Sequence, residues 1–255
     1  MTYPRALVLH ATGSNRDHEA SLALELAGAM PEVVPLNQLR SCKKRWSDYQ
    51  MLVIPGGFAN ADVLGAGKLL ALDLNVYFVE EVSAFVAAGK PVIGICNGFQ
   101  ALVKAGLLPG GLPATLTFNA SGHFECRWVT LRPQSTRCIW THGMAEPVYC
   151  PVAHGEGRFM LSDPAQAAEL QAHDQVALVY AHRDGKPAGD DYPDNPNGSL
   201  AGIAGVCNSQ GNVLGLMPHP EDYIYTYQHP RHTRGESAGS GLALFSNGVQ
   251  YAAQL

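Results

Sequence analysis

The sequence carries little charge and has no long hydrophobic run. Charged residues make up 15% of the 255 positions, and the formal net charge is −5. No window reaches the roughly 18 consecutive apolar residues of a membrane-spanning helix, so we expect no membrane contact. The longest basic run, Lys43-Lys44-Arg45, is too short for the electrostatic footprint of a nucleic-acid-binding protein. We therefore expect no nucleic acid among its partners.

A signal peptide and metal-binding cysteine pairs are also missing. Residues 1–5 lead into an apolar, strand-like segment without the charged and apolar regions of a signal peptide. None of the six cysteines forms a Cys-x-x-Cys pair, which argues against a structural zinc site, and we predict no metal. We expect a cytoplasmic protein whose thiols are reduced and mostly buried.

The sequence lacks a phosphate-binding loop of the form Gly-x-x-x-x-Gly-Lys-Ser/Thr. The nearest segment, Gly65–Lys68, is followed by Leu69 and has no glycine at the first position of the motif. We interpret it as an ordinary loop and expect no nucleotide or other cofactor to be bound by this chain.

Short apolar segments alternate with helical patterns along the chain. We predict strands at 5–10, 33–34, 51–54, 91–95, 176–180 and 212–217, and helices at 19–30, 76–88, 97–105 and 240–254. Such alternation is typical of βαβ units and a parallel sheet. Residues 126–131 alternate between apolar and polar, which predicts added antiparallel strands within 115–152.

These patterns predict a single domain over residues 1–255, with an α/β fold of three layers, α/β/α. Its open sheet would be mostly parallel, with added antiparallel strands. The turn-rich segment 190–198 could mimic a domain linker. We interpret it as a surface loop, because strand patterns resume directly after it.

The segment Gly94–Gly98 joins a strand to a helix through a tight turn centred on Cys96. The pattern Gly-x-Cys-x-Gly has the mechanics of a nucleophile elbow, in which a strained backbone projects the central side chain from the sheet. The helix N-terminus favours a thiolate there. A buried cysteine beside chance glycines would give the same five letters, so this pattern alone leaves both readings open.

A cysteine nucleophile needs a base and a group that orients the base. His219 lies just after the predicted strand 212–217, and Glu221 can reach its ring from two residues on. His154, in the glycine-rich segment 153–159, is the competing base. The His229-x-x-His232 spacing suggests a metal, but a solvated loop is the better reading because no cysteine partner lies near it in sequence.

The segments Gly94–Gln100 and Pro218–Glu221 together resemble the class I glutamine amidotransferases. Further stretches resemble the glutaminase subunit of phosphoribosylformylglycinamidine synthase: Gly13–Asp17, Pro55–Phe58, Ala153–Phe159, Asn195–Ser199 and Asn212–Glu221. The similarity spans nearly the whole chain and implies the flavodoxin-like, class I glutamine amidotransferase fold. It also implies that Cys96 attacks the glutamine side-chain amide, while His219 transfers the proton and Glu221 orients His219.

The resemblance implies further site residues. The backbone N–H groups of Gly57 and Asn97 would form an oxyanion hole, and Gln100, His154 and Glu156 would lie near the bound glutamine. The family usually continues Pro-Gly-Gly-Phe with Ser-Tyr-Gly-Asp, whereas here 59–62 reads Ala-Asn-Ala-Asp. The aspartate is kept, but the aromatic residue and one glycine are lost.

The same resemblance implies a partner. A synthetase subunit, with or without a small accessory subunit, would use ATP and Mg²⁺ to convert formylglycinamide ribonucleotide to formylglycinamidine ribonucleotide in purine biosynthesis. This chain would supply the ammonia and be more active when bound. Two alternatives remain: a PfpI-like cysteine hydrolase or chaperone, which lacks the Pro-His-Pro-Glu segment, and a catalytically silent scaffold.

Overall fold

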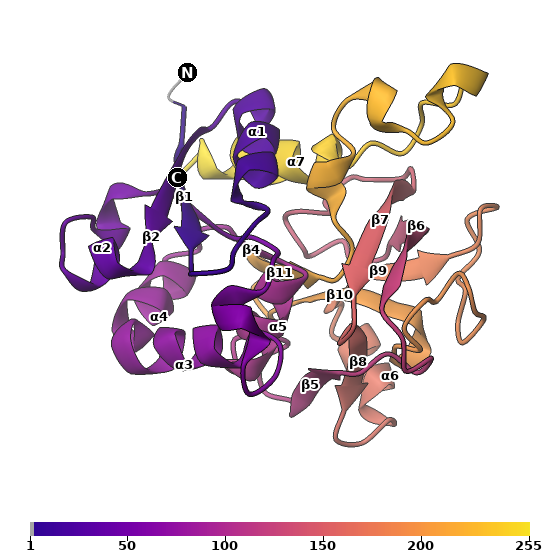
Figure 1. Ribbon diagram of the computed structural model, residues 1–255, viewed down its shortest axis with the longest axis horizontal. Coiled ribbons are helices and arrows are strands. Elements are labelled where there is room, and N and C mark those ends of the chain that lie inside the picture. Colours follow the sequence, from indigo (N-terminus) through magenta and orange to yellow (C-terminus); the bar gives the residue numbers. More distant parts are fainter. Residues whose placement is uncertain (1–2) are drawn as a thin grey trace.

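One nine-stranded mixed sheet organises the molecule (Figure 1). The computed structural model describes residues 3–255; Met1 and Thr2, part of the segment searched for a signal peptide, lie outside them. In sheet order the strands are β2 (Met30–Pro35), β1 (Arg5–His10), β3 (Met51–Ile54), β4 (Val92–Ile95), β11 (Val213–Leu216), β10 (Ile203–Cys207), β9 (Val176–Ala181), β6 (Glu125–Pro133) and β7 (Val148–His154). A separate antiparallel pair consists of β5 (Ala114–Thr117) and β8 (Arg158–Leu161).

The sheet has a parallel and an antiparallel half. The neighbours from β2 through β1, β3 and β4 to β11 are all parallel. From β11 through β10, β9 and β6 to β7, all neighbours are antiparallel. The predicted α/β fold with added antiparallel strands is confirmed, but the sheet is half antiparallel, whereas a mostly parallel sheet was expected. That the whole chain is one domain stays a prediction, which the continuity of this sheet supports.

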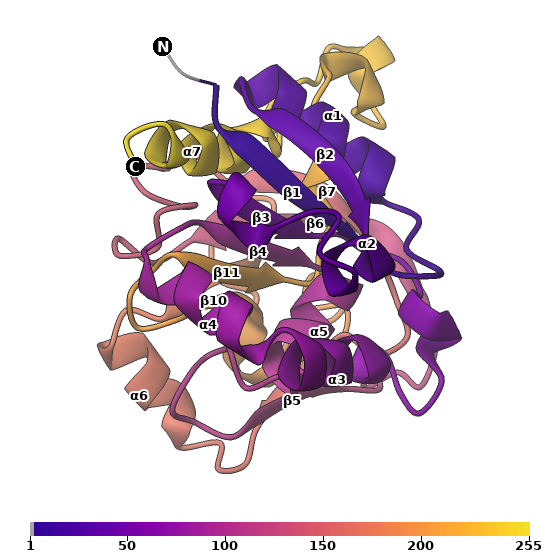
Figure 2. The same cartoon turned by 90° about the vertical axis from the view of Figure 1, so that its left-hand side faces the viewer.

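Helices cover both faces of the parallel half, giving the three expected layers. The helices of the described residues are α1 (Asp17–Ala27), α2 (Leu36–Arg40), α3 (Lys68–Tyr77), α4 (Val79–Ala87), α5 (Asn97–Lys104), α6 (Gln166–Ala172) and α7 (Leu242–Ala252). Helices α1 and α7 contact each other on one face, and α3, α4 and α5 lie on the other (Figure 2). Within residues 3–255, no helix has the length and hydrophobicity needed to cross a membrane.

Two predicted helices have the wrong bounds. The helix predicted at 19–30 ends at Ala27, because Gly28 adopts a left-handed conformation and its N–H bonds to the carbonyl of Glu25; Met30 already belongs to β2. The helix predicted at 76–88 is broken at Phe78, where φ is −130°. Its first two residues, Val76 and Tyr77, are the end of α3, a helix that the hydrophobic pattern did not predict.

The turn-rich segment 190–198 is not a purely surface loop. Asn195 and Asn197 are buried. The Asn197 side-chain amide donates to the hydroxyl of Tyr180 at 3.0 Å and to the carbonyl of Gly157 at 2.8 Å. The segment therefore supports the 154–157 loop from the interior, a role that its turn-rich composition concealed.

Glycines make the turn after β4 possible. A Cβ atom at Gly98 would lie 2.0 Å from the carbonyl oxygen of Ile54, so α5 can approach β3 only with glycine there. We expect Gly98→Ala to lower the free energy of unfolding by about 1–3 kcal/mol through overpacking. Urea unfolding would measure this. Gly155→Ala is the control, since its nearest neighbour, Phe124, would be 3.8 Å away, and an equal loss there would contradict the explanation.

Candidate active site

Cys96 sits on a strained turn at the carboxyl end of β4. Its φ and ψ are 50° and −103°, a conformation that non-glycine residues rarely adopt. The Cys96 N–H donates to the carbonyl of Leu216, the last residue of β11, at 2.8 Å. Because β4 and β11 are parallel neighbours, the segments that follow them emerge at the same edge of the sheet. This topology brings Cys96 and His219 together across more than one hundred residues of sequence.

His219 and Glu221 form a buried hydrogen-bonded pair. Nδ1 of His219 lies 2.7 Å from Oε1 of Glu221, and a short 3-10 turn, Pro220–Asp222, folds the carboxylate back onto the ring. The His219 N–H donates to the carbonyl of Pro151 in β7 at 2.8 Å, which fixes the backbone. Since Nδ1 is bonded to Glu221, Nε2 is the ring nitrogen left to exchange a proton with a thiol.

The electrostatics of His219 suit a thiolate–imidazolium pair. Burial by itself lowers the pKa of His219, but the negative charges of Glu221 and Cys96 outweigh it and raise the pKa well above its usual value. The ring therefore holds a proton at neutral pH when the thiol has lost one. This is the protonation state that an attacking cysteine and a later proton donor require.

His154, the competing base, lies nearby but is held as a neutral ring. Burial, together with the positive charge of His219, lowers the pKa of His154 to about 4. Its Nδ1 lies 3.0 Å from Oδ1 of Asn119, and its Nε2 lies 3.5 Å from Nδ2 of Asn197. A ring this weakly basic accepts a proton poorly at neutral pH, so the structure favours His219 as the base.

Of the two expected oxyanion donors, Gly57 lines the cavity that contains Cys96, and Asn97 directly follows Cys96 in sequence. Gly57 has a φ of 138° and pairs with Ser14 in an isolated bridge, in which the N–H of Phe58 bonds to Gly13. Within residues 3–255 the backbone N–H groups of Gly57 and Asn97 have no hydrogen-bond acceptor. Asn97 is also the first residue of α5, where unpaired N–H groups and the helix dipole favour an anion.

The side chain of Asn97 connects α5, the helix that follows Cys96, to residues 59–62, where the sequence differs from the usual family pattern. Its Oδ1 accepts from the N–H of Ala59 at 3.0 Å, and its Nδ2 donates to Asp62 and to Gln100, each at 2.9 Å. Ala61 adopts a left-handed φ of 55° where the family usually has glycine. The loop thus has a left-handed conformation that usually requires glycine, although Ala61 stands there. The hydrogen bond between Asp62 and Asn97 helps to hold the loop in this conformation.

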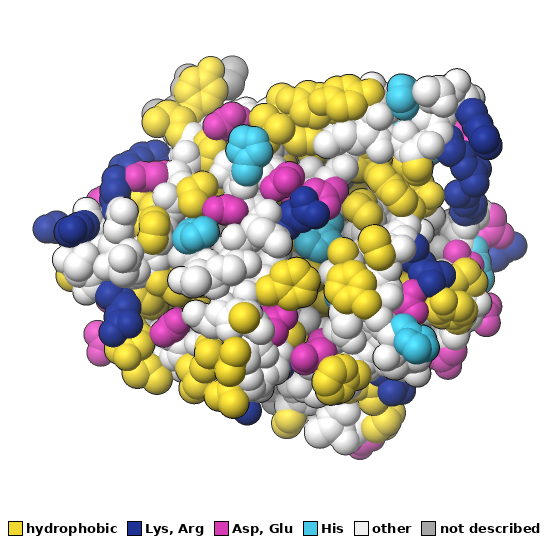
Figure 3. Space-filling view, viewed as in Figure 1, with side chains coloured by type: hydrophobic (Ala, Val, Ile, Leu, Met, Phe, Trp, Pro, Cys, Tyr) yellow, Lys and Arg dark blue, Asp and Glu magenta, His cyan; other side chains and the backbone are white. Residues whose placement is uncertain are grey.

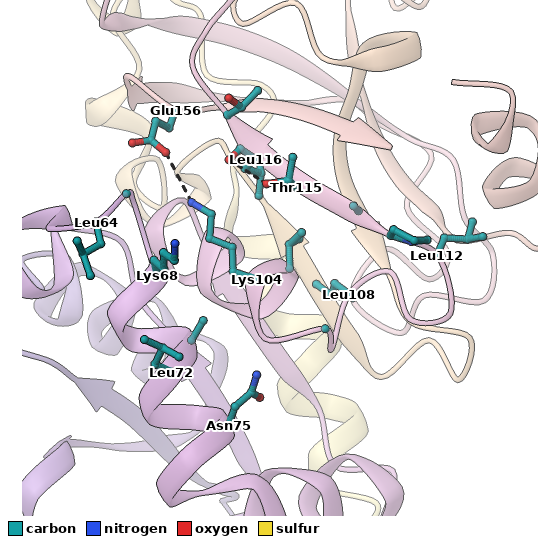
Figure 4. A pocket seen from close by; sticks show the side chains of 17 residues that line it. Leu64, Lys68, Leu72, Asn75, Lys104, Leu108, Leu112, Thr115, Leu116 and Glu156 are labelled. Carbon is teal, nitrogen blue, oxygen red and sulfur yellow. Dashed lines mark hydrogen bonds and ion pairs between the residues drawn. The ribbon is translucent and has the colours of Figure 1, made fainter. Parts of the chain in front are cut away.

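Gln100 and Glu156 line the small cavity at Cys96, although their polar groups already bond to the protein. Nε2 of Gln100 donates to the backbone carbonyl of Glu156 at 2.7 Å. The Glu156 carboxylate accepts from the N–H of Ala66 at 3.2 Å and lies 3.6 Å from Nζ of Lys104 (Figure 4). The structure therefore gives both residues a part in shaping the pocket wall.

The cavity is about 170 Å³ in volume and has Cys96 in its wall. Its other lining residues come from four places: the 57–66 loop, α5, the 118–124 segment and the 153–156 loop. Sequence reasoning missed Phe118 and Phe124, which lie in a segment without periodicity, and Asn119, whose amide bonds to the 154–157 loop. Their only signal was a pair of phenylalanines and an asparagine just before the alternating residues 126–131.

The donor atoms of His219, Glu221 and Asp222 lie within 4.8 Å of one another, a spacing that also suits a cation. Existing interactions account for these groups. His219 Nδ1 is bonded to Glu221, and Arg16 faces Asp222 from 3.7 Å. Burial, together with the charge of Glu221, raises the pKa of Asp222 to about 6. We interpret the cluster as the base and its orienting carboxylate, with an ion-paired neighbour.

The site is that of a cysteine-dependent amidohydrolase. It combines a cysteine elbow, a histidine–glutamate pair and two unpaired backbone N–H groups at the carboxyl end of a parallel sheet. A family model described as the CobB/CobQ-like glutamine amidotransferase domain matches residues 3–252, and the chain belongs to that family. It is 53% identical over 266 residues to phosphoribosylformylglycinamidine synthase subunit PurQ of Treponema denticola, covering 97% of this chain and 98% of that protein.

A second relative and two solved structures support the same family assignment or share its fold. The PurQ subunit of Dehalococcoides mccartyi is 42% identical over 263 residues, with both chains fully covered. A chain from the structure of PurLQS from Thermotoga maritima matches with a TM-score of 0.76 and 32% identity, covering 98% of this chain and 99% of that one. A glutamine amidotransferase structure from Thermotoga maritima, at 13% identity and a TM-score of 0.57, shares the fold.

Proposed function

We propose that this chain is the glutaminase subunit of phosphoribosylformylglycinamidine synthase. The observation that carries the chemistry is the placement of Cys96 and the His219–Glu221 pair at the ends of neighbouring strands, beside a glutamine-sized cavity. The relatives named PurQ match this chain along nearly its whole length, and they supply the particular pathway.

The reaction begins when the Cys96 thiolate attacks the side-chain amide carbon of glutamine. The carbonyl oxygen becomes negative and is stabilised by the N–H groups of Gly57 and Asn97, each contributing about 3 kcal/mol. His219 gives its proton to the nitrogen, so that the carbon–nitrogen bond breaks and ammonia leaves. Water, deprotonated by His219, then cleaves the thioester and releases glutamate.

The ammonia is consumed by an ATP-dependent synthetase subunit, which converts formylglycinamide ribonucleotide to formylglycinamidine ribonucleotide in purine biosynthesis. PurLQS from Thermotoga maritima contains a chain similar to this one, which supports an assembly with a synthetase and a small third subunit. ATP and Mg²⁺ belong to that partner. The protein works in the cytoplasm, where its six free cysteines stay reduced.

Reconstitution tests the function. The chain is mixed with the synthetase subunit, the small subunit, ATP, Mg²⁺ and formylglycinamide ribonucleotide. Glutamine labelled with ¹⁵N in its amide is expected to transfer the label to formylglycinamidine ribonucleotide. Without this chain, only added ammonium salts should support the reaction. Hydrolysis of glutamine without labelled product would exclude this acceptor while leaving the glutaminase chemistry in place.

The alternatives are less well supported. A PfpI-like hydrolase or chaperone would not need the Pro-His-Pro-Glu segment, which here forms the turn that places Glu221 against His219. A silent scaffold would have no reason to keep Cys96 in a strained conformation beside that pair.

A further inference from the structure

The loop between β1 and α1 packs directly against the segment 56–60. We call residues 11–16 the β1–α1 loop. The N–H of Phe58 donates to the carbonyl of Gly13 in this loop at 3.0 Å. None of the residues 11–16 lines the cavity that contains Cys96. The loop therefore does not touch a substrate in that cavity, and any part that it has in catalysis must act through the segment 56–60.

A further hydrogen bond fixes the peptide group between Gly56 and Gly57. The N–H of Asn15 donates to the carbonyl of Gly56 at 3.4 Å. In a trans peptide the carbonyl and the N–H that follows it point in opposite directions, so the N–H of Gly57 points away from Asn15. Gly57 lines the cavity that contains Cys96, and its N–H has no acceptor within residues 3–255. The bond to Asn15 thus leaves this N–H available for an oxyanion.

The close approach of the two segments restricts rotation of that peptide group. Adjacent glycines such as Gly56 and Gly57 would otherwise let it rotate at little cost. A Cβ atom at Gly57 would lie 2.7 Å from the backbone nitrogen of Asn15, and one at Gly13 would lie 2.2 Å from the carbonyl oxygen of Phe58. The β1–α1 loop is therefore the restraint that decides which way the Gly57 N–H points.

The β1–α1 loop is held in shape by Ser14. The Ser14 hydroxyl oxygen accepts from the N–H of Ala11 at 3.2 Å, and the Ser14 N–H donates to the carbonyl of Ala11 at 2.9 Å. Ser14 also forms the isolated bridge with Gly57. A change in the Ser14 side chain therefore loosens the part of the loop that contacts Gly57.

Arg16 connects the end of the β1–α1 loop to the turn that carries the catalytic base. Its Nη1 lies 3.7 Å from Oδ1 of Asp222 and 3.1 Å from Oε1 of Glu19. Figure 3 shows basic and acidic side chains side by side near the middle of this view. A Cβ atom at Gly56 would lie 2.6 Å from Cε1 of His219 and 3.5 Å from Cγ of Arg16. The loop, the glycine pair and the base thus pack as one unit.

We propose that the β1–α1 loop fixes the Gly57 N–H in the orientation that stabilises the oxyanion, with Gly13 and Ser14 as positioning residues. The inference rests on the proposed function, because it concerns the hydrolysis of glutamine at Cys96. It gives the stretch Gly13–Asp17 a role in the reaction, although none of its side chains reaches the cavity.

Gly13→Ala tests the proposal, because the added methyl group would displace the carbonyl of Phe58 and turn the backbone beside Gly57. We expect kcat for glutamine hydrolysis to fall about 10²-fold while KM stays within about threefold, since an oxyanion donor acts in the transition state. Alkylation of Cys96 by iodoacetamide forms no oxyanion, so its rate should match that of the parent chain. This difference separates a misplaced oxyanion donor from a damaged nucleophile.

Gly28→Ala is the matched control. The φ of Gly28 is 96°, close to the 94° of Gly13, but a Cβ atom at Gly28 would meet nothing within 4 Å. Both variants therefore carry similar backbone strain, and Gly28→Ala should keep kcat within about twofold of the parent value. An equal loss of kcat in the two variants, or slow alkylation of Cys96 in Gly13→Ala, would overturn the proposal.

Two Ser14 variants decide the matter if Gly13→Ala does not fold. Ser14→Ala loses the hydrogen bond from Ala11 and should lower kcat about three- to tenfold, whereas Ser14→Thr keeps the hydroxyl and should stay within about twofold of the parent. Parent-like kcat in Ser14→Ala, or an equal loss in Ser14→Thr, would contradict the proposal. The parent chain tests the proposed function separately. If it hydrolyses glutamine and the loop variants do so equally well, the positioning role fails and the function stands.

Discussion

Replacing Cys96 with alanine is expected to reduce glutamine hydrolysis by about 10³-fold or more, because no other group can form the glutamyl thioester. The fold should persist, since the side chain shrinks by one atom and the backbone bonds of the elbow remain. Steady-state hydrolysis and circular dichroism would measure the two effects.

Cys42→Ala is the matched control, because Cys42 is an exposed thiol that does not line the cavity. It should retain the parent activity. A glutamine-like electrophile should label Cys96 and spare the other five cysteines. Substantial activity in Cys96→Ala, or labelling spread over all six thiols, would show that the nucleophile is a different residue.

The second large loss of activity is expected when His219, the catalytic base, is replaced. His219→Ala is expected to lose nearly as much activity as Cys96→Ala, whereas Glu221→Gln should lose about 10²- to 10⁴-fold. Glutamine keeps an oxygen to accept from Nδ1 of His219 but removes the charge that holds the imidazolium. Oε2 of Glu221 has no partner among the described residues, so the new amide N–H₂ gains none there.

The contact between Glu221 and His219 also predicts how Glu221→Gln changes the pKa of His219. Glu221 raises the pKa of His219, so its neutralisation lowers that pKa. The imidazolium of His219 then becomes less stable, and NMR should show the ring losing its proton at a lower pH than in the parent chain. If His154→Ala were as damaging as Cys96→Ala while His219→Ala was harmless, the assignment of the base would be reversed.

Regular elements with strong periodicity were predictable, and irregular segments were not. Buried apolar runs such as Met51–Ile54 appear as strands at the predicted positions, because four apolar residues bounded by a turn are too few for a helix and pair their backbone groups in the sheet. The predicted helix at 76–88 was wrong at its start. Val76 and Val79 are exposed, and the break at Phe78 separates two helices whose apolar residues had looked continuous.

The sequence by itself determined the chemistry of the chain: a cysteine between two glycines, a His-x-Glu after an apolar strand, and a pattern of strands that places both at one sheet edge. Tertiary structure alone decided which histidine is basic, because burial and hydrogen bonding of His154 come from Asn119 and Asn197, distant in sequence. It also decided that segment 190–198 lies partly inside the molecule, where Asn195 and Asn197 are buried. Burial and left-handed strain depend on contacts between remote segments, which local patterns do not encode.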